Sequence, residues 1–223
     1  MRARIADACG RAGRDPASVQ LIAVSKGQPP EIVAGAAALG LCVFGENKVQ
    51  EAKAKIPLCP GRLRWHMIGH LQSNKARDAV ALFEMAHSVD SLALAQELNK
   101  RADAAAKRLP ILLEVNIAGE ASKHGLSPAA ALEHLDAINA LPRLEVHGLM
   151  TMAPWTPDLE RVRRVFRRLR EVKSECEQRL GAPLPHLSMG MTSDFEVAIG
   201  EGATMVRIGT ALFGPRPRKD DAA

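Results

Sequence analysis

The sequence of 223 residues contains no tyrosine, and its aromatic residues amount to 3%, from five Phe and two Trp. Modules that bind single-stranded nucleic acid stack bases on several surface aromatic side chains, so this composition excludes them. It also excludes any reaction mechanism that needs a tyrosine from this chain. The missing residue type therefore limits both the partners and the chemistry of the protein.

Cysteine and long apolar segments are scarce as well. The four cysteines form no Cys-x-x-Cys pair and have no histidine at zinc-finger spacing, so we expect ordinary buried thiols in a reducing compartment and no metal site. Residues 1–13 lack the apolar segment of a signal peptide, and no apolar run reaches the ~18 residues of a membrane span. These features predict a cytoplasmic protein without a membrane partner.

The charge is modest, with 30 basic and 25 acidic side chains and a net charge of +5. Much of the excess lies between Arg161 and Lys173, a run that could bind a phosphate backbone. Apolar residues of the same segment recur at helical spacing: Val162, Val165, Phe166, Leu169 and Val172. The arginines therefore fit the solvated face of an amphipathic helix, and we expect no nucleic-acid partner.

Short apolar segments alternate with helical patterns along the whole chain. Strands are predicted at 19–26, 41–47, 63–71, 85–91, 110–117, 144–152, 186–190 and 204–213. Helices are predicted between them, most clearly at 92–108, 128–141 and 159–180. Ser73 is well placed to cap the helix that follows the third strand.

Alternation of about eight strands with about eight helices is typical of parallel βαβ units. An open doubly wound sheet and a (β/α)8 TIM barrel both satisfy it. No Gly-x-Gly-x-x-Gly follows the first strand, and eight units in this length favour the barrel. No linker or internal repeat divides the chain, so we predict one α/β barrel domain over residues 1–223, with its core at about 19–214.

Functional groups of such a barrel lie where the strands end. Lys26 ends the first predicted strand, on the same side as Ile22 and Val24 by period two. A lysine inside the barrel mouth is partly desolvated, which lowers its pKa and frees the amine to attack a carbonyl. A lysine that extends from the strand end into solvent is the alternative.

Two segments near the end of the chain suit an anion. The loops after strands seven and eight of such barrels often bind phosphate. Ser188, Met189 and Gly190 end the seventh predicted strand, and Gly209–Thr210 lie in the eighth, where they offer hydroxyls and accessible N–H groups. Ordinary turn residues are the alternative. Together with Lys26, these segments suggest a phosphorylated aldehyde as the ligand.

Arg207 lies in an apolar segment, where it needs an acceptor or a cavity. Facing the ring nitrogen of a cofactor, it could only donate a hydrogen bond, so that nitrogen would stay unprotonated. Such a ring is a weak electron sink. An ion pair with Glu114 or Glu201 is the alternative for Arg207.

Seven segments in collinear order resemble the pyridoxal phosphate homeostasis proteins. They are residues 23–26 (AVSK), 44–51 (FGENKVQE), 65–75 (WHMIGHLQSNK), 114–125 (EVNIAGEASKHG), 147–152 (HGLMTM), 187–194 (LSMGMTSD) and 206–214 (VRIGTALFG). The resemblance covers about residues 19–214. Two departures are visible: Gly27 stands where the family usually has Thr, and the N-terminal helix is shorter than usual.

The resemblance implies a barrel like the N-terminal domain of alanine racemase that holds pyridoxal 5'-phosphate (PLP) as a Schiff base on Lys26. It implies positions beside the cofactor for Asn47, at the phosphate for Ser188, Gly209 and Thr210, with Met189 in the same loop, and at the ring nitrogen for Arg207. Lys123 would be a second basic residue that helps the cofactor enter or leave, or else a loop lysine in water.

The family is regarded as a carrier or regulator of PLP supply that affects amino-acid and keto-acid balance. The expected partners are PLP and apo-enzymes that receive it, and the expected state is a monomer. A PLP-dependent amino-acid racemase is the alternative. It needs a second acid–base group opposite the lysine, which is a tyrosine of the partner subunit in alanine racemase. Without tyrosine and with few residues after Phe213, we expect no enzyme, although His70 or a cysteine could replace that group.

Overall fold

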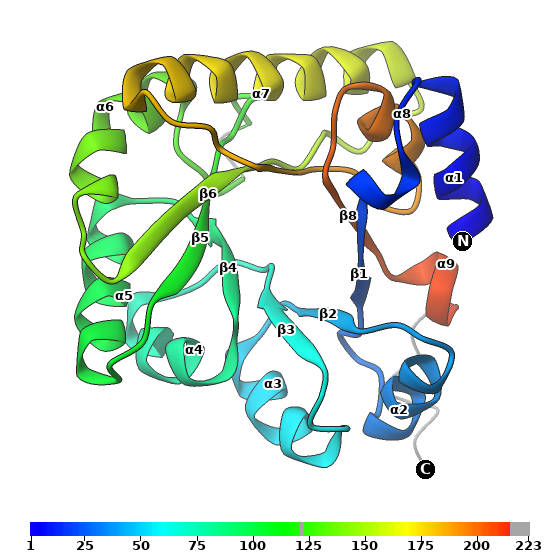
Figure 1. Cartoon of the computed structure of the whole chain (residues 1–223), viewed down its shortest axis with the longest axis horizontal. Coiled ribbons are helices and arrows are strands. Elements are labelled where there is room, and N and C mark those ends of the chain that lie inside the picture. Colours follow the sequence, from blue (N-terminus) through cyan, green and yellow to red (C-terminus); the bar gives the residue numbers. More distant parts are fainter. Residues whose placement is uncertain (121–122, 215–223) are drawn as a thin grey trace.

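Eight parallel strands close into a barrel, which confirms the predicted fold (Figure 1). The structure is a computed structural model that describes residues 1–120 and 123–214, so residues 121–122 and 215–223 of the predicted domain lie outside the described part. The strands follow one another around the barrel in chain order, and the last pairs with the first. They are β1 (Gln20–Val24), β2 (Val43–Glu46), β3 (Arg64–Met67), β4 (Met85–Val89), β5 (Leu109–Glu114), β6 (Leu144–Met150), β7 (His186–Ser188) and β8 (Met205–Ile208).

Helices surround the strands, because each parallel strand needs a crossover that returns the chain to the same end of the barrel (Figure 1). They are α1 (Arg2–Arg11), α2 (Pro30–Ala38), α3 (Val49–Lys55), α4 (Ala76–Leu82), α5 (Leu92–Ala104), α6 (Pro128–Asn139), α7 (Leu159–Leu180), α8 (Phe195–Gly200) and α9 (Thr210–Phe213). Single 3₁₀ turns occur at η1 (Pro16–Ser18), η2 (Ile56–Leu58) and η3 (Ser73–Lys75). The first helix, α1, packs beside α8 (Figure 1).

Two local predictions were wrong. The strand predicted at 204–213 ends at Ile208, and the chain turns at Gly209 into α9. Ser73 does not cap a helix with its side chain, because it opens the 3₁₀ turn η3 that precedes α4. The first difference matters for function, since Gly209 lies at the turn after β8 and Thr210 begins α9, so neither belongs to the strand.

The longest helix, α7, has the predicted bounds and the predicted amphipathic face. The Asp158 side chain accepts hydrogen bonds from the N–H groups of Glu160 and Arg161, and Gly181 ends the helix in the left-handed conformation. The face toward the barrel buries Val162, Val165, Phe166, Leu169, Val172 and Cys176. Burial of this apolar stripe holds α7 against the sheet.

The basic face of α7 is largely neutralised within the chain. Arg163, Arg167 and Arg170 surround the buried Glu201 at 3.2 to 3.3 Å. Other basic residues of the helix also contact carboxylates: Arg168 those of Glu171 and Glu175, Lys173 that of Glu177, and Arg179 that of Asp136. This pairing weakens the face as a surface for a phosphate backbone.

The cysteines only partly follow the prediction of buried thiols. Cys9 and Cys176 are buried, whereas Cys59 is half-buried and Cys42 is exposed. All four are free.

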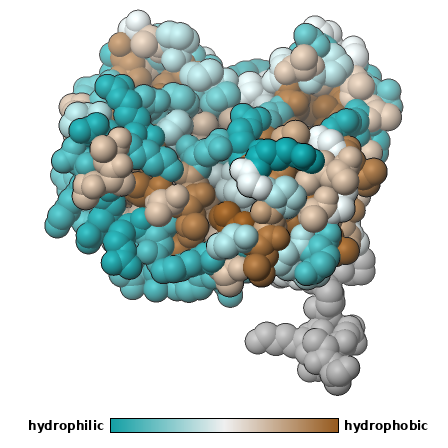
Figure 2. Space-filling view, turned by 60° about the horizontal axis from the view of Figure 1, so that its bottom comes forward, coloured by the Kyte–Doolittle hydropathy of each residue, from teal (hydrophilic) through white to brown (hydrophobic). Residues whose placement is uncertain are grey.

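In the described part of the chain, no helix has the length and apolar character that a membrane span requires. On the face seen in Figure 2, hydrophilic residues cover most of the surface, and hydrophobic residues form patches between them.

The barrel has an apolar layer inside and a larger core outside. The inner layer contains one residue from each of six strands: Ile22, Val43, Met85, Leu112, Met150 and Met205. The outer core fills the space between strands and helices and includes Phe44, Phe83, Phe166 and Phe195, all fully buried. Buried polar residues also lie inside the barrel, among them His66, His87, Ser188 and Arg207, and they lead to the functional site.

One glycine makes the β6–β7 pairing possible. Gly148 lies opposite His186 in the register, with φ at +153°, and a Cβ at this position would overlap the His186 backbone carbonyl. We predict that Gly148→Ala lowers the free energy of unfolding by more than about 3 kcal/mol, because the strands must separate.

The matched control is Gly35→Ala in α2, where a Cβ meets nothing within 4 Å. This change should raise stability by up to about 1 kcal/mol through helix propensity. Urea unfolding of both variants measures the difference. Equal stability of Gly148→Ala and wild type would contradict the close approach.

Candidate functional site

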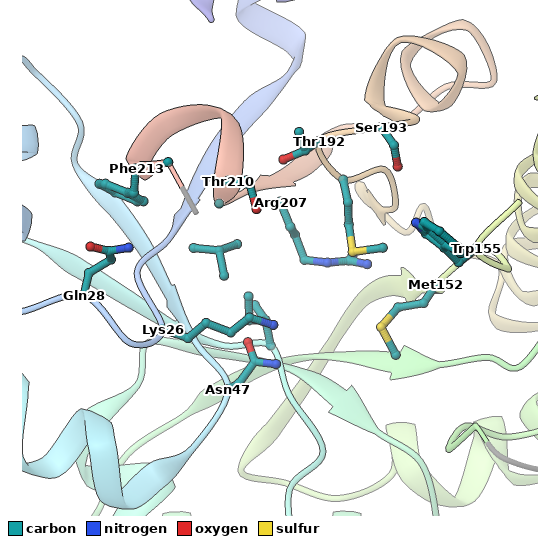
Figure 3. A pocket seen from close by; sticks show the side chains of 15 residues that line it. Lys26, Gln28, Asn47, Met152, Trp155, Thr192, Ser193, Arg207, Thr210 and Phe213 are labelled. Atoms are coloured by element: carbon teal, nitrogen blue, oxygen red, sulfur yellow. The ribbon is translucent and has the colours of Figure 1, made fainter. Parts of the chain in front are cut away.

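A cavity of about 390 Å³ opens at the end of the barrel where the strands finish (Figure 3). Polar and cationic side chains share it with apolar ones, as is usual for small-molecule sites. The lining residues are Val24, Lys26, Gln28, Asn47, Ile68, Met152, Trp155, Met191, Thr192, Ser193, Arg207, Gly209, Thr210, Phe213 and Gly214. They come from strand ends and loops that are far apart in the sequence.

Five of the seven predicted site residues line this cavity: Lys26, Asn47, Arg207, Gly209 and Thr210. The side chains of Lys26, Asn47 and Arg207 point into the same space (Figure 3). Val24 also lines the cavity, so the predicted alternation that puts Lys26 on its side of β1 is in agreement with the structure.

The other two predicted residues lie below the cavity. The Ser188 hydroxyl is fully buried and contacts Arg207, and the Met189 side chain belongs to the hydrophobic core. Their loop contributes Thr192 and Ser193 instead, four and five residues beyond Ser188. Those hydroxyls lie in one of the resembling segments, 187–194, so the sequence carried the signal. The sequence contains no signal that Trp155 lines the cavity, because a tryptophan is usually part of a core. In the structure its exposed fraction is 97%.

Asp194 shapes the loop that carries Thr192 and Ser193. Its carboxylate accepts a hydrogen bond of 2.6 Å from the Met191 N–H, and burial raises its pKa. At the start of the loop, Gly190 has φ at +93°, and a Cβ there would press against α8. The backbone N–H of Arg207 bonds to the Gly190 carbonyl, which joins this loop to β8.

A buried ion-pair network holds the backbone on both sides of Lys26. Lys55, which is 6% exposed, donates to the Ser25 carbonyl at 2.7 Å and to carboxylate oxygens of Glu46 and Glu51 at 2.8 Å. Glu51 also accepts from the Gly27 N–H at 2.5 Å. The network therefore fixes the residue before Lys26 and the residue after it. The Lys26 backbone is therefore held in place at the barrel rim.

The two carboxylates of the network differ in their surroundings. Burial raises the pKa of Glu46, although hydrogen bonds from Lys55 and Ser25 act against the rise. Burial also works to raise the pKa of Glu51, but hydrogen bonds from Lys55 and Gly27 outweigh it, and the pKa is lowered. Glu51 is thus held in the charged form that binds the Gly27 N–H.

Arg207 spans the floor of the cavity. Its Nη1 donates to Ser188 Oγ at 2.6 Å and its Nη2 to the Thr151 carbonyl at 2.9 Å. Burial lowers its pKa to about 10, so the guanidinium stays protonated at neutral pH. The alternative of an ion pair is wrong: within the described ranges Arg207 contacts neither Glu114 nor Glu201, because Glu201 binds the arginines of α7.

Lys123 and His70, two further residues of the sequence analysis, lie outside the cavity lining. Lys123 is half-buried, pairs with Glu120 at 3.1 Å and donates to the Ala153 carbonyl at 3.3 Å. Lys123 is therefore not fully surrounded by water, and a part for it in the entry or exit of a cofactor stays a prediction. None of the four cysteines lines the cavity either.

His70 belongs to the one group of three possible metal ligands among the described residues. Its Nδ1 is 3.1 Å from an Asp90 oxygen, and its ring stacks on His124 with centroids 3.6 Å apart. The ligand atoms lie within 4.8 Å of one another, but both histidines are exposed. A hydrogen bond and ring stacking account for this cluster without an ion.

Glu114 is buried at the end of β5, and its Oε2 has no hydrogen-bond partner among the described residues. Burial raises its pKa to about 7, and the nearby charge of Asp90 adds to the rise, while Arg207 acts against it. The folded protein therefore binds a proton that the unfolded chain releases near pH 4.5. This stabilising contribution is complete below about pH 4.5 and is lost as the pH rises through about 7.

We predict that Glu114→Gln removes this pH dependence. Relative to wild type, the variant should gain about 3 kcal/mol of unfolding free energy between about pH 4.5 and pH 8, at 1.36 kcal/mol per pKa unit. The matched control is Glu133→Gln, an exposed residue of α6. Denaturant unfolding across this pH range measures both variants. A constant difference between Glu114→Gln and wild type would refute the buried proton.

Comparison with known proteins identifies the family. The chain matches the alanine racemase N-terminal domain family over residues 1–217. It is 47% identical over 215 residues to the pyridoxal phosphate homeostasis protein of Pseudomonas aeruginosa, covering 96% of this chain and 92% of that protein. Identity to the protein of the same name from Aquifex aeolicus is 45% over 214 residues, with 96% and 94% covered.

A solved structure is similar along its whole length. PipY of Synechococcus elongatus PCC7942, with PLP bound, matches at a TM-score of 0.83 and 39% identity, over 94% of this chain and 100% of that one. With its closed barrel and the family match, the protein thus belongs to the class of the alanine racemase N-terminal domain. Within this class, the chain belongs to the family of the pyridoxal phosphate homeostasis proteins.

Proposed function

We propose that this protein binds PLP in the mouth cavity through a Schiff base on Lys26 and acts in the control of intracellular PLP supply. The observation that carries the proposal is the convergence of a lysine amine, a buried arginine and several hydroxyls on one cavity. A phosphorylated pyridine aldehyde needs an amine for its aldehyde, a donor for its ring nitrogen and hydroxyls for its phosphate. The binding of PLP by the similar protein PipY supports the same ligand.

The cavity fits PLP in two further respects. The Oδ1 atom of Asn47 is buried without a hydrogen-bond partner among the described residues, so it is available to a donor of a ligand. Gly209 approaches Val24 so closely that a Cβ would lie 3.3 Å from the Val24 carbonyl oxygen. The missing side chain therefore leaves the Gly209 backbone open to a ligand.

We assign a role to each group. Lys26 would hold PLP through its amine, which is the partner that an aldehyde requires. Thr192, Ser193 and Thr210, with the Gly209 backbone, hold the phosphate, and Arg207 donates to the ring nitrogen. PLP, when bound, supplies a ring that withdraws electrons from an attached amine. Since Arg207 can only donate, it keeps the ring nitrogen unprotonated and weakens that withdrawal.

A role without turnover follows from these assignments. A racemase needs a second acid–base group opposite the lysine, and this chain has no tyrosine, while His70 and the cysteines lie outside the cavity lining. We propose a cytoplasmic, monomeric carrier or regulator that exchanges PLP with apo-enzymes and so affects amino-acid and keto-acid balance. A PLP-dependent racemase remains the alternative.

We predict that the purified protein with PLP shows the visible absorption band of a Schiff base, which borohydride removes. Lys26→Ala should lose the band, because no other lysine lines the cavity in the described part of the chain. Lys123→Ala, the matched control, should keep it. Absorption spectra with and without borohydride measure this. A band of equal strength in Lys26→Ala would overturn the proposed attachment.

The carrier and the racemase make different predictions with amino acids. After incubation of the PLP-loaded protein with L-alanine, the carrier predicts unchanged chirality by chiral chromatography. It also predicts transfer of PLP to an apo-enzyme faster than free dissociation from the protein. Sustained formation of D-alanine would replace the carrier by the racemase.

A further inference from the structure

A file of four hydrogen-bonded side chains crosses the barrel interior beneath the cavity. Arg207 Nη1 is 2.6 Å from Ser188 Oγ, which is 2.9 Å from His87 Nδ1. His87 Nε2 is in turn 3.0 Å from His66 Nδ1. The four residues come from β8, β7, β4 and β3, and each is at most 4% exposed. They form a continuous polar path within the barrel.

Arg207 sets the direction of every hydrogen bond in this file. A guanidinium only donates, so Ser188 Oγ accepts from it. The single hydroxyl proton of Ser188 then goes to His87 Nδ1, which puts the His87 proton on Nε2. That N–H donates to His66 Nδ1, and the proton of His66 is therefore on its own Nε2.

The opposite direction leaves a buried donor without a partner. If His87 Nδ1 carried the proton and donated to Ser188, the Ser188 hydroxyl would have no acceptor for its own proton among the described residues. An unsatisfied buried donor costs about 1–3 kcal/mol. The direction that begins at Arg207 is therefore favoured.

Both imidazoles are neutral at physiological pH. Burial lowers the pKa of His66 to about 4, and it lowers the pKa of His87 well below the ordinary value. The aligned dipoles of the file therefore turn their negative ends toward the guanidinium. With the Thr151 carbonyl, they solvate the Arg207 charge, which has no carboxylate ion-pair partner in the described part of the chain.

We propose that His87 and His66 are positioning residues that hold Arg207, through Ser188, in place for a ligand in the cavity. A neutral support adds no negative charge to those of Glu114 and Asp194, which already act on the guanidinium, whereas a carboxylate in hydrogen-bond contact would offset its charge much further. Arg207 then presents a strong donor to an acceptor atom. Only the effect on PLP rests on the proposed function; the proton positions do not.

Nitrogen NMR of the histidine side chains in the unliganded wild-type protein tests the file directly. Variants that each lack one histidine assign the signals. We expect His87 and His66 to be neutral, with the proton on Nε2, from about pH 6 to about pH 8, where an ordinary histidine titrates. A proton on Nδ1 of His87, or a charged ring in this range, would overturn the proposal.

Two variants of His87 test its effect on Arg207. His87→Leu removes the acceptor for Ser188, whereas His87→Asn keeps an amide oxygen close to the position of Nδ1. We expect the dissociation constant of PLP to rise about 10-fold or more in His87→Leu, with a shifted absorption band, and less than about 3-fold in His87→Asn. His147→Leu on β6, outside the file, should match wild type.

Equal PLP affinity and spectrum in His87→Leu and wild type would refute the positioning role. If His87→Leu fails to fold, the NMR measurement still tests the proton positions. The His87→Asn variant then still tests the predicted PLP affinity. If wild type itself binds no PLP, the proposed function fails, while the NMR result judges the proton positions independently. The two failures are therefore distinguishable.

Discussion

Closure of eight parallel strands is the constraint on which the rest of this structure depends. Because all strands run the same way, their carboxyl ends meet at one rim, and side chains distant in sequence converge there. Closure also makes the interior narrow, so that an inward side chain must meet another one. The apolar layer from Ile22 to Met205 fills part of this interior, and the polar file from Arg207 to His66 fills another.

Two buried networks hold different residues of the site at the rim. Outside the strands, Lys55 and its carboxylates fix the backbone next to Lys26 by charge pairing. Inside the barrel, neutral groups hydrogen-bond to Arg207, and the carboxylates that act on its charge, Glu114 and Asp194, form no direct ion pair with it among the described residues. The site thus combines a lysine whose backbone is held firmly with an arginine whose charge is available to a ligand. A protein that binds PLP needs such a lysine and such an arginine. It does not need the second acid–base group that a racemase uses.

The sequence was a good guide to the fold because hydrophobic periodicity is a local property. It predicted eight strands, the barrel and the bounds of α7, and it predicted Lys26 and Asn47 at the mouth. It failed at 204–213, where apolar residues of a strand and of α9 follow one another and only Gly209 marks the change. It predicted Ser188 and Met189 as binding residues, whereas in this loop the cavity lining begins only at Met191. The hydrogen-bonded file was not predictable, because it joins residues from four strands.

Peptide mass mapping after borohydride reduction of the PLP-loaded protein tests the central claim most directly. The account predicts that the added mass lies on the peptide that contains Lys26. An added mass on a peptide that contains another lysine, or none on any peptide, would contradict it.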